Sequence, residues 1–228
     1  MYHPAGEGPG TPFEDENFEF IELQNFGSET VDLTGFELEG VIDFRFTETN
    51  ALRFLPAGSR LLLVENAAAF NQRYPTLGPV AGTYRNRLDN GSGRLALFGP
   101  LREPVFDFRY SDEWQPTTDG TGPSLVLREE TRGSLYPADA ANWRSSSRPF
   151  GSPGALDPPP LRLTTELLDD ALHIHLIGES GQTYILEQMT ALGRGWQPAD
   201  SKKAGVDGIV TFSILPVSTQ RLFRVLEP

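Results

Sequence analysis

The sequence has no cysteine among its 228 residues. This absence excludes disulfide bonds, zinc sites built from thiolates and cysteine nucleophiles. It does not fix the cellular compartment, because a chain of this length can bury enough apolar surface to fold without covalent cross-links. The sequence also lacks any run of about 18 apolar residues, which a transmembrane helix requires, so we expect no insertion into a membrane.

Basic residues are outnumbered. The chain has 19 Lys and Arg against 31 Asp and Glu, which gives a formal net charge of -12 at pH 7. Contacts with phosphate supply most of the nonspecific affinity of a protein for nucleic acid, and an acidic surface repels phosphate. We therefore expect neither nucleic acid nor anionic membranes as partners, and we attribute the charge to solubility.

Motifs for catalysis and for cofactors are also missing. The chain has no Gly-x-Ser-x-Gly elbow, and its three histidines do not suggest a Ser-His-Asp group. Gly91 and Gly93 lack both the following helix and the Lys-Ser/Thr pair of a phosphate-binding loop. The sequence therefore predicts no enzyme, no cofactor and no catalytic residue.

Two histidines leave a metal site open as an alternative. His173 and His175 are two residues apart, so they share one face of a strand, a spacing that suits a metal ion. Leu172, Ile174 and Leu176 occupy the opposite face, which favours exposed structural histidines instead. His3 is distant in sequence and would be a poor third ligand.

Acidic loops offer a second, weaker metal hypothesis. Glu14, Asp15 and Glu16 could supply half of a calcium site, since calcium binds several oxygen ligands, but their spacing matches no EF-hand. Asp112 and Asp119 lie in a loop at 111–123, and a pair of carboxylates can do acid and base catalysis, although nothing in the sequence fixes their separation. A solvated loop is the prediction we favour in both places.

What the sequence does contain points to short strands. Phe alone numbers 15, and Gly 23 and Pro 19 supply turn residues throughout. Many aromatics combined with many turn residues favour an all-β protein. The stretch 17–46 carries three or four short β-segments, in which Val31 and Leu33 flank Asp32 with the alternation of a half-buried strand.

Further elements follow along the chain. Residues 60–64 are typical of a buried strand, and strands are also predicted near 95–98, 105–110 and 124–127. One helix is predicted over 66–74, with Asn66 as its cap and with Phe70 and Tyr74 on one face. Trp143 is predicted to cover one end of the core, with its indole N–H bonded locally.

Composition divides the chain in two. Residues 149–160 read PFGSPGALDPPP, and three consecutive prolines exclude both a helix and a central strand. We therefore predict a domain at 1–148, a semi-rigid linker at 149–160 and a smaller domain at 161–228. Seven or so short β-segments in the last part predict a small β-sandwich.

Several blocks together resemble a known family. They are FEFIELQNFGSETVDLTGFEL at 18–38, LPAGSRLLLVENAAAFNQRYP at 55–75, GTYRNRLDNGSGRLALFG at 82–99, YSDEWQPTTDGTGPSLVL at 110–127, NWR at 142–144 and GSPG at 151–154. The chain resembles the lamin-tail domain in the form found in surface proteins of planctomycete- and verrucomicrobia-type bacteria. The resemblance implies an immunoglobulin-like β-sandwich, with Phe36 where the family usually has a tryptophan.

The same resemblance carries expectations about context. GQTYIL at 181–186, Trp196 and RLFRV at 221–225 look like small β-domains that end many such bacterial surface proteins. The location that the resemblance implies is extracellular or at the bacterial cell surface. Met1-Tyr2-His3-Pro4 is no signal peptide, so we expect either a cytoplasmic chain or a mature or excised piece of a longer one. The resemblance implies a longer, multidomain chain, because the family usually has a few apolar residues before a Met-Tyr-x-Pro stretch. The nuclear role of animal lamin tails is not carried over, since no heptad repeat is present. The kinase activity found beside some bacterial relatives is not carried over either.

The favoured function is a non-catalytic structural, adhesion or protein-interaction module that presents loops at 5–17 and 111–123. Its partner would be a protein or a surface polysaccharide. The alternatives are a carbohydrate-binding module using Tyr84, Tyr110 and Trp114, accessory domains of a larger enzyme, and a metal-dependent hydrolase. The candidate contact residues are Glu14, Asp15, Asp112, Trp114 and Asp119.

Overall fold

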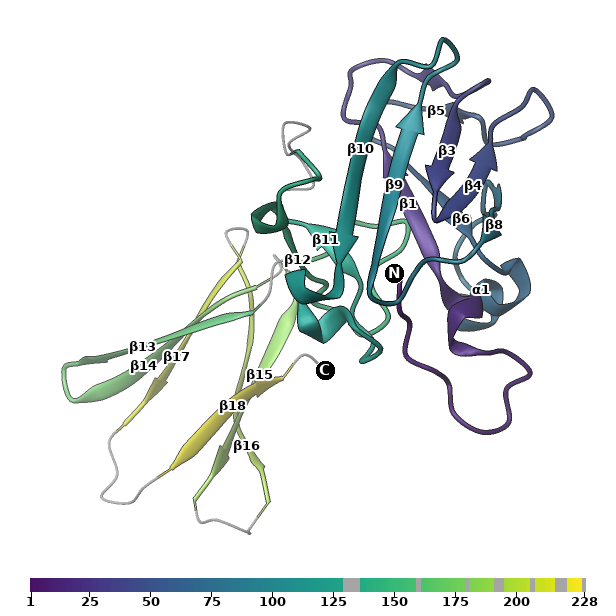
Figure 1. The fold of residues 1–228 in the computed structure, drawn as a ribbon. Coiled ribbons are helices and arrows are strands. Elements are labelled where there is room, and N and C mark those ends of the chain that lie inside the picture. The colour runs from purple at the N-terminus through teal and green to yellow at the C-terminus, as the bar shows by residue number, and fades with distance from the viewer. Residues whose placement is uncertain are drawn as a thin grey trace. The chain divides into compact units, whose positions relative to one another are not determined.

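The computed structural model describes residues 1–128, 136–158, 161–178, 181–190, 195–205, 208–215 and 221–226 (Figure 1). Strands dominate these residues, which confirms the all-β prediction. The chain divides into two compact units, residues 1–157 and 158–228. The α-helix has seven residues, and no described helix is long and apolar enough to cross a membrane.

The first unit contains two main sheets. The larger has the order β10-β9-β3-β4-β8, and the smaller has the order β1-β6-β7, with β7 parallel to β6. The larger sheet consists of β3 (Glu37–Gly40), β4 (Ile42–Arg45), β8 (Arg85–Asn86), β9 (Ser92–Phe98) and β10 (Pro104–Ser111). The smaller consists of β1 (Phe20–Gln24), β6 (Arg60–Val64) and β7 (Gly82–Thr83). Two short ladders pair β2 (Val31–Asp32) with β5 (Phe54–Leu55), and β11 (Leu125–Leu127) with β12 (Trp143–Ser145).

The core of this unit lies between the two sheets. Leu23 and Leu63 from the smaller sheet pack in one cluster with Leu38 and Leu97 from the larger, and Phe46 is fully buried among them. This cluster forms because alternate residues of each strand point to one face. The result is a β-sandwich, and β6 matches the buried strand predicted at 60–64. The immunoglobulin-like type remains a prediction.

Helix α1 (Ala67–Arg73) covers the outer face of the smaller sheet. The Asn66 side chain caps it by accepting hydrogen bonds from the backbone N–H groups of Ala68 and Ala69. The ring of Phe70 is fully buried and packs edge-on against Phe20, with centroids 5.8 Å apart. The helix and its cap are therefore confirmed as predicted, because both signals are local.

The segment predicted as the start of a linker, 149–157, packs instead on the first unit. The Tyr74 hydroxyl donates to the Phe150 carbonyl, and the Gly154 N–H donates to Glu22 Oε2. Asp157 is buried and paired with Arg144. Proline and glycine indicate irregular backbone but do not report whether it has contacts, so the boundary falls at Asp157 rather than at 148. Pro159 and Pro160 lie outside the described residues.

The second unit also contains two sheets. They have the orders β13-β14-β17 and β16-β15-β18. The strands are β13 (Arg162–Leu168), β14 (Ala171–Ile177), β15 (Thr183–Met189), β16 (Gln197–Lys203), β17 (Ile209–Ile214) and β18 (Leu222–Leu226). Ile174, Leu176 and Phe212 from one sheet pack with Tyr184 and Leu186 from the other. The two sheets therefore form a small sandwich.

Replacing Phe36 tests the packing of the first unit. Its ring is half-buried against the main core, so we expect Phe36→Ala to lower the free energy of unfolding by about 2–3 kcal/mol. Equilibrium unfolding in urea measures this cost, with the exposed Leu101→Ala as the control. A cost below about 1 kcal/mol would place the ring outside the core.

Candidate functional site

An apolar groove opens on one side of the first unit. It lies where each main sheet ends, at β1 and at β10, and its volume is about 580 Å³. Its apolar lining includes Ile21 of β1, Phe26 of the loop after β1, Phe36 before β3, Val105 and Phe106 of β10, and Leu125 of β11. Phe26 is 41% exposed and Val105 is 55% exposed, so part of this apolar lining faces solvent.

A group of aromatic rings lies along the β10 side of the groove. Phe108 stacks on Trp143 with centroids 5.8 Å apart and on Trp114 with centroids 6.4 Å apart. The Trp143 indole N–H donates to the Pro137 carbonyl at 2.8 Å, which confirms the predicted local bond. Trp114 is therefore half-buried within a stack of rings, and rigid aromatic surface of this kind contributes much of the energy at protein interfaces.

Asn25 fixes the mouth of the groove. Its side chain is buried, and its amide donates to the carbonyls of Glu29 at 2.7 Å and Leu55 at 2.9 Å. Its Oδ1 accepts from the Gly27 N–H at 2.8 Å. These three bonds hold the turn that carries Phe26, and this is the turn chemistry expected of Asn at this position.

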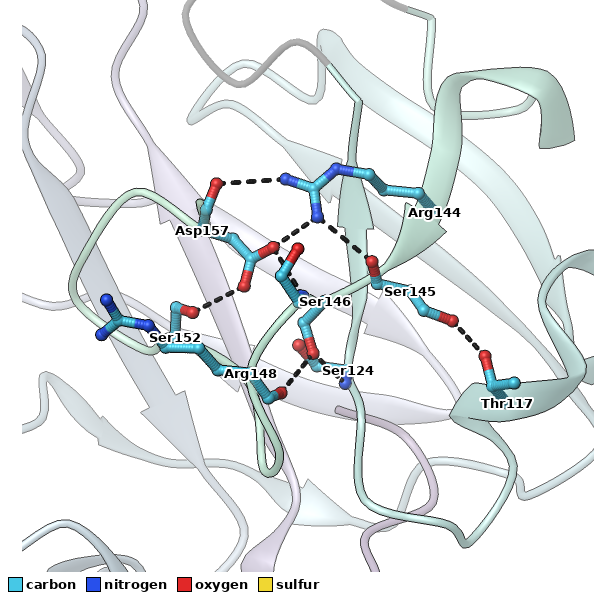
Figure 2. Close-up of polar contacts among 9 residues, drawn as sticks. Thr117, Ser124, Arg144, Ser145, Ser146, Arg148, Ser152 and Asp157 are labelled. Atoms are coloured by element: carbon cyan, nitrogen blue, oxygen red, sulfur yellow. Dashed lines mark hydrogen bonds and ion pairs between the residues drawn. The ribbon is translucent and has the colours of Figure 1, made fainter. Parts of the chain in front are cut away.

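A polar network fixes β11, which also lines the groove (Figure 2). Ser146 accepts a hydrogen bond from the Ser124 N–H at 2.8 Å through its hydroxyl and donates its own N–H to the Ser124 carbonyl at 2.7 Å. Asp157 pairs with Arg144 and accepts from the Ser147 N–H at 2.9 Å and the Ser152 hydroxyl at 2.6 Å. The network links the β11–β12 ladder to the segment 149–157. These hydrogen bonds therefore hold in place two of the segments that line the groove.

The acidic residues near the start of the chain lie beside an arginine. Glu14 precedes the short helix η1 (Asp15–Phe18), where Asp15 is the first residue. The Arg87 guanidinium lies 3.5 Å from Glu14, 3.7 Å from Glu16 and 3.9 Å from Glu65. An arginine therefore neutralises part of this acidic surface. Within the described ranges, no group of three or more His, Cys, Asp or Glu side chains is placed to hold a metal ion.

The residues of the loop at 111–123 serve local structure. Asp112 and Trp114 are the first and last residues of the short helix η2, and Asp119 follows the short helix η3 (Pro116–Thr118). Asp119 lies 2.5 Å from His3 Nδ1, and the Gly120 N–H donates to the His3 carbonyl at 3.1 Å. These contacts attach the first residues of the chain to the loop.

The three aromatics proposed as a sugar platform are not an exposed face. Tyr84 is 6% exposed and its hydroxyl donates to Glu19 Oε2 at 3.1 Å, while Tyr110 is 2% exposed and donates to the Asp89 carbonyl at 2.8 Å. Trp114 packs against other rings. These positions therefore do not provide the coplanar exposed face that the carbohydrate-binding alternative requires, and buried packing is the use we expected for these rings.

In the second unit, His173 and His175 share a face of β14 as predicted. Their rings stack with centroids 6.2 Å apart. The Nδ1 atom of His173 is 3.1 Å from the Ser213 hydroxyl, and that of His175 is 2.9 Å from the Thr211 hydroxyl. The hydroxyls of β17 thus hold both rings, and the pair has the half-exposed position of structural histidines.

Glu19 is an unusual buried residue that sequence analysis did not single out. It is fully buried, and its Oε2 accepts from the Leu88 N–H at 2.8 Å and from the Tyr84 hydroxyl. Burial raises its pKa to about 8, so the carboxyl is largely protonated at neutral pH. Its position between Phe18 and Phe20 was the available signal, since a polar residue within an apolar run is either exposed or bonded in the core.

Comparison with known proteins gives little further guidance. No family model matches the chain, and no curated protein matches it. Among solved structures, one described as "Cytokine receptor complex - Crystal form 1A" aligns with 92% of this chain and 78% of its own, at 13% identity and a TM-score of 0.26.

Proposed function

We propose that the chain is a non-catalytic protein-interaction module that binds apolar side chains of a partner protein in the groove of its first unit. The observation that carries this proposal is the half-exposed apolar lining, with Phe26 and Val105 at its surface. Exposed apolar surface rimmed by polar residues is typical of protein interaction sites. The walls are held by the Asn25 turn and by the Arg144–Asp157 network, so little conformational entropy is lost on binding.

A protein partner fits this lining better than a polysaccharide does. Sugar binding uses an exposed aromatic face together with converging polar groups. The described residues place Tyr84 and Tyr110 in the core instead. An extended peptide segment can insert alternate apolar side chains into a groove that lies beside a sheet edge.

The proposed setting is structural or adhesive, in a longer chain exported by a bacterium or held at its surface. This part of the proposal is supported by the resemblance to bacterial lamin-tail proteins. It is consistent with the acidic net charge of -12, which favours solubility at high local concentration.

A library of short displayed peptides, panned against the whole chain, tests the proposed function. We expect selected peptides with apolar residues at alternating positions, and we expect Phe26→Glu to weaken their binding by about tenfold or more, since it places a charge in an apolar site. Leu101→Glu is the matched control, because Leu101 is 88% exposed and is not part of the groove lining.

An oligosaccharide array probed with the same protein provides the competing outcome. The proposal predicts that no glycan binds in the groove, so no glycan signal should be lost in the Phe26→Glu variant. Selected peptides that bind Phe26→Glu as well as the native chain would show that the groove is not their site.

A further inference from the structure

Strand β10 forms an outer edge of the larger sheet (Figure 1). Along it the side chains alternate: Phe106, Phe108 and Tyr110 contribute to the main core, while Asp107 and Arg109 are exposed on the other face. At eight residues it is a long strand for a sheet edge. An edge of this kind presents unpaired backbone groups to which another chain can bind.

The direction of these backbone groups follows from the hydrogen bonds at the ends of the ladder. The Asp112 N–H donates to the Gly91 carbonyl at 2.7 Å, on the β9 side, and Val41 on the opposite side of β9 donates to the Arg94 carbonyl at 3.0 Å. In an antiparallel ladder the backbone N–H and C=O groups of successive residues point alternately toward the paired strand and away from it. The backbone groups of Phe108 and Tyr110 therefore bond to β9, while those of Asp107 and Arg109 point outward. No described residue bonds to these outward groups.

Of the two exposed charged residues on this edge, Asp107 has an ion-pair partner among the described residues and Arg109 does not. Asp107 accepts two hydrogen bonds from Arg94, at 2.9 Å and 2.7 Å. Arg109 lies directly opposite Arg94 in the register of the two strands. Like charges directly opposite each other are destabilising. Arg109 has no ion-pair partner within the described part of the chain.

We propose that β10 binds the β10 strand of a second copy of this chain, antiparallel and centred on Phe108. A symmetric pair must match outward residues with outward residues, so its axis passes through a residue. Centring on Asp107 would oppose two aspartates, and centring on Arg109 would oppose two arginines. Centring on Phe108 places Asp107 opposite Arg109 of the second copy, twice, and gives each Arg109 an opposite charge.

The ends of the strand limit how far this pairing extends. The β10 register shifts between Pro104 and Phe106, and the short helix η2 turns the chain away from Asp112 onward. The contact is therefore smaller than the roughly 1,600 Å² of a standard interface. Each copy also carries a net charge of -12. We expect a dimer that forms with increasing protein concentration and not a permanent one.

Charge reversal tests the pairing in the full chain. Sedimentation equilibrium should show a concentration-dependent dimer for the native protein, with association weakened about tenfold or more in Asp107→Arg and in Arg109→Asp, since each variant opposes like charges twice. An equimolar mixture of the two variants should dimerise again, because every opposed pair is then complementary. Both residues are exposed, and circular dichroism confirms that each variant is folded.

Cysteine pairs test the register, because the native chain has no cysteine. Residues 107 and 109 of the two copies would lie about 5.5 Å apart, within reach of a disulfide. Oxidation should therefore link Asp107→Cys to Arg109→Cys in a mixture and should leave each variant alone unlinked. A native chain that stays monomeric, equal dimerisation of the single charge variants and the native chain, or a disulfide formed by Asp107→Cys alone would each overturn the proposal.

Discussion

Asp157→Ala is expected to lower the free energy of unfolding of the first unit by about 3–5 kcal/mol, because removing one partner of a buried ion pair leaves an uncompensated charge. The Asp157 side chain is 1% exposed and that of Arg144 is 12% exposed. The same carboxylate also accepts from the Ser147 N–H. It accepts from the Ser152 hydroxyl as well, as Figure 2 shows. Urea unfolding of the native and variant chains measures the difference.

Two further variants separate charge from hydrogen bonding. Asp157→Asn keeps an acceptor for the Ser147 N–H and removes the charge. We therefore expect it to lower the free energy of unfolding by less than Asp157→Ala does. Asp43→Ala removes an exposed carboxylate bonded to Asn86 and should cost less than about 0.5 kcal/mol. If Asp157→Ala cost no more than Asp43→Ala, the segment 149–157 would not be held by this pair.

Glu19 is expected to make the native protein less stable as pH rises from about 4.5 to about 8, the span between its usual pKa and its raised value. Within that window the native state keeps a proton that the unfolded chain has released, so stability falls as pH rises. The full effect is on the order of 3–5 kcal/mol, at about 1.4 kcal/mol for each pKa unit. Glu19→Gln stays neutral at every pH, keeps an acceptor for Leu88 and should remove this slope.

Urea unfolding at several pH values from about 5 to about 8 measures both proteins. Burial lowers the pKa of the Met1 amine to about 5, so this amine contributes a slope of opposite sign, and the Glu19 carboxyl interacts with it. The difference between the two profiles therefore reports the titration of Glu19 together with its interaction with Met1, Tyr84 and Glu65. Parallel profiles would show that the Glu19 carboxyl is ionised in the native state.

The elements that were predicted correctly from the sequence are those specified by residues close together in the chain. Asn66 followed by three alanines specifies α1, and the apolar run at 60–64 specifies β6, because capping and alternation depend on neighbouring residues. These patterns were enough for the all-β class and for two units.

Features that depend on strand order were not predicted. The groove exists because β1 and β10 are both sheet edges, and no local pattern reports which strands lie at an edge. Asp157 pairs with Arg144 across a segment that composition alone marks as a linker. The burial of Tyr84 and Tyr110 follows likewise from packing between sheets and not from their neighbours in sequence.

Methyl NMR of the whole chain, titrated with a peptide selected on it, tests the central claim that the groove is the binding surface. The account predicts shifts at the methyl groups of Ile21, Val105 and Leu125, which line the groove, and none at Leu101 or at Leu167 in the second unit. Shifts at Leu101 or Leu167 without shifts at the groove methyls would contradict it.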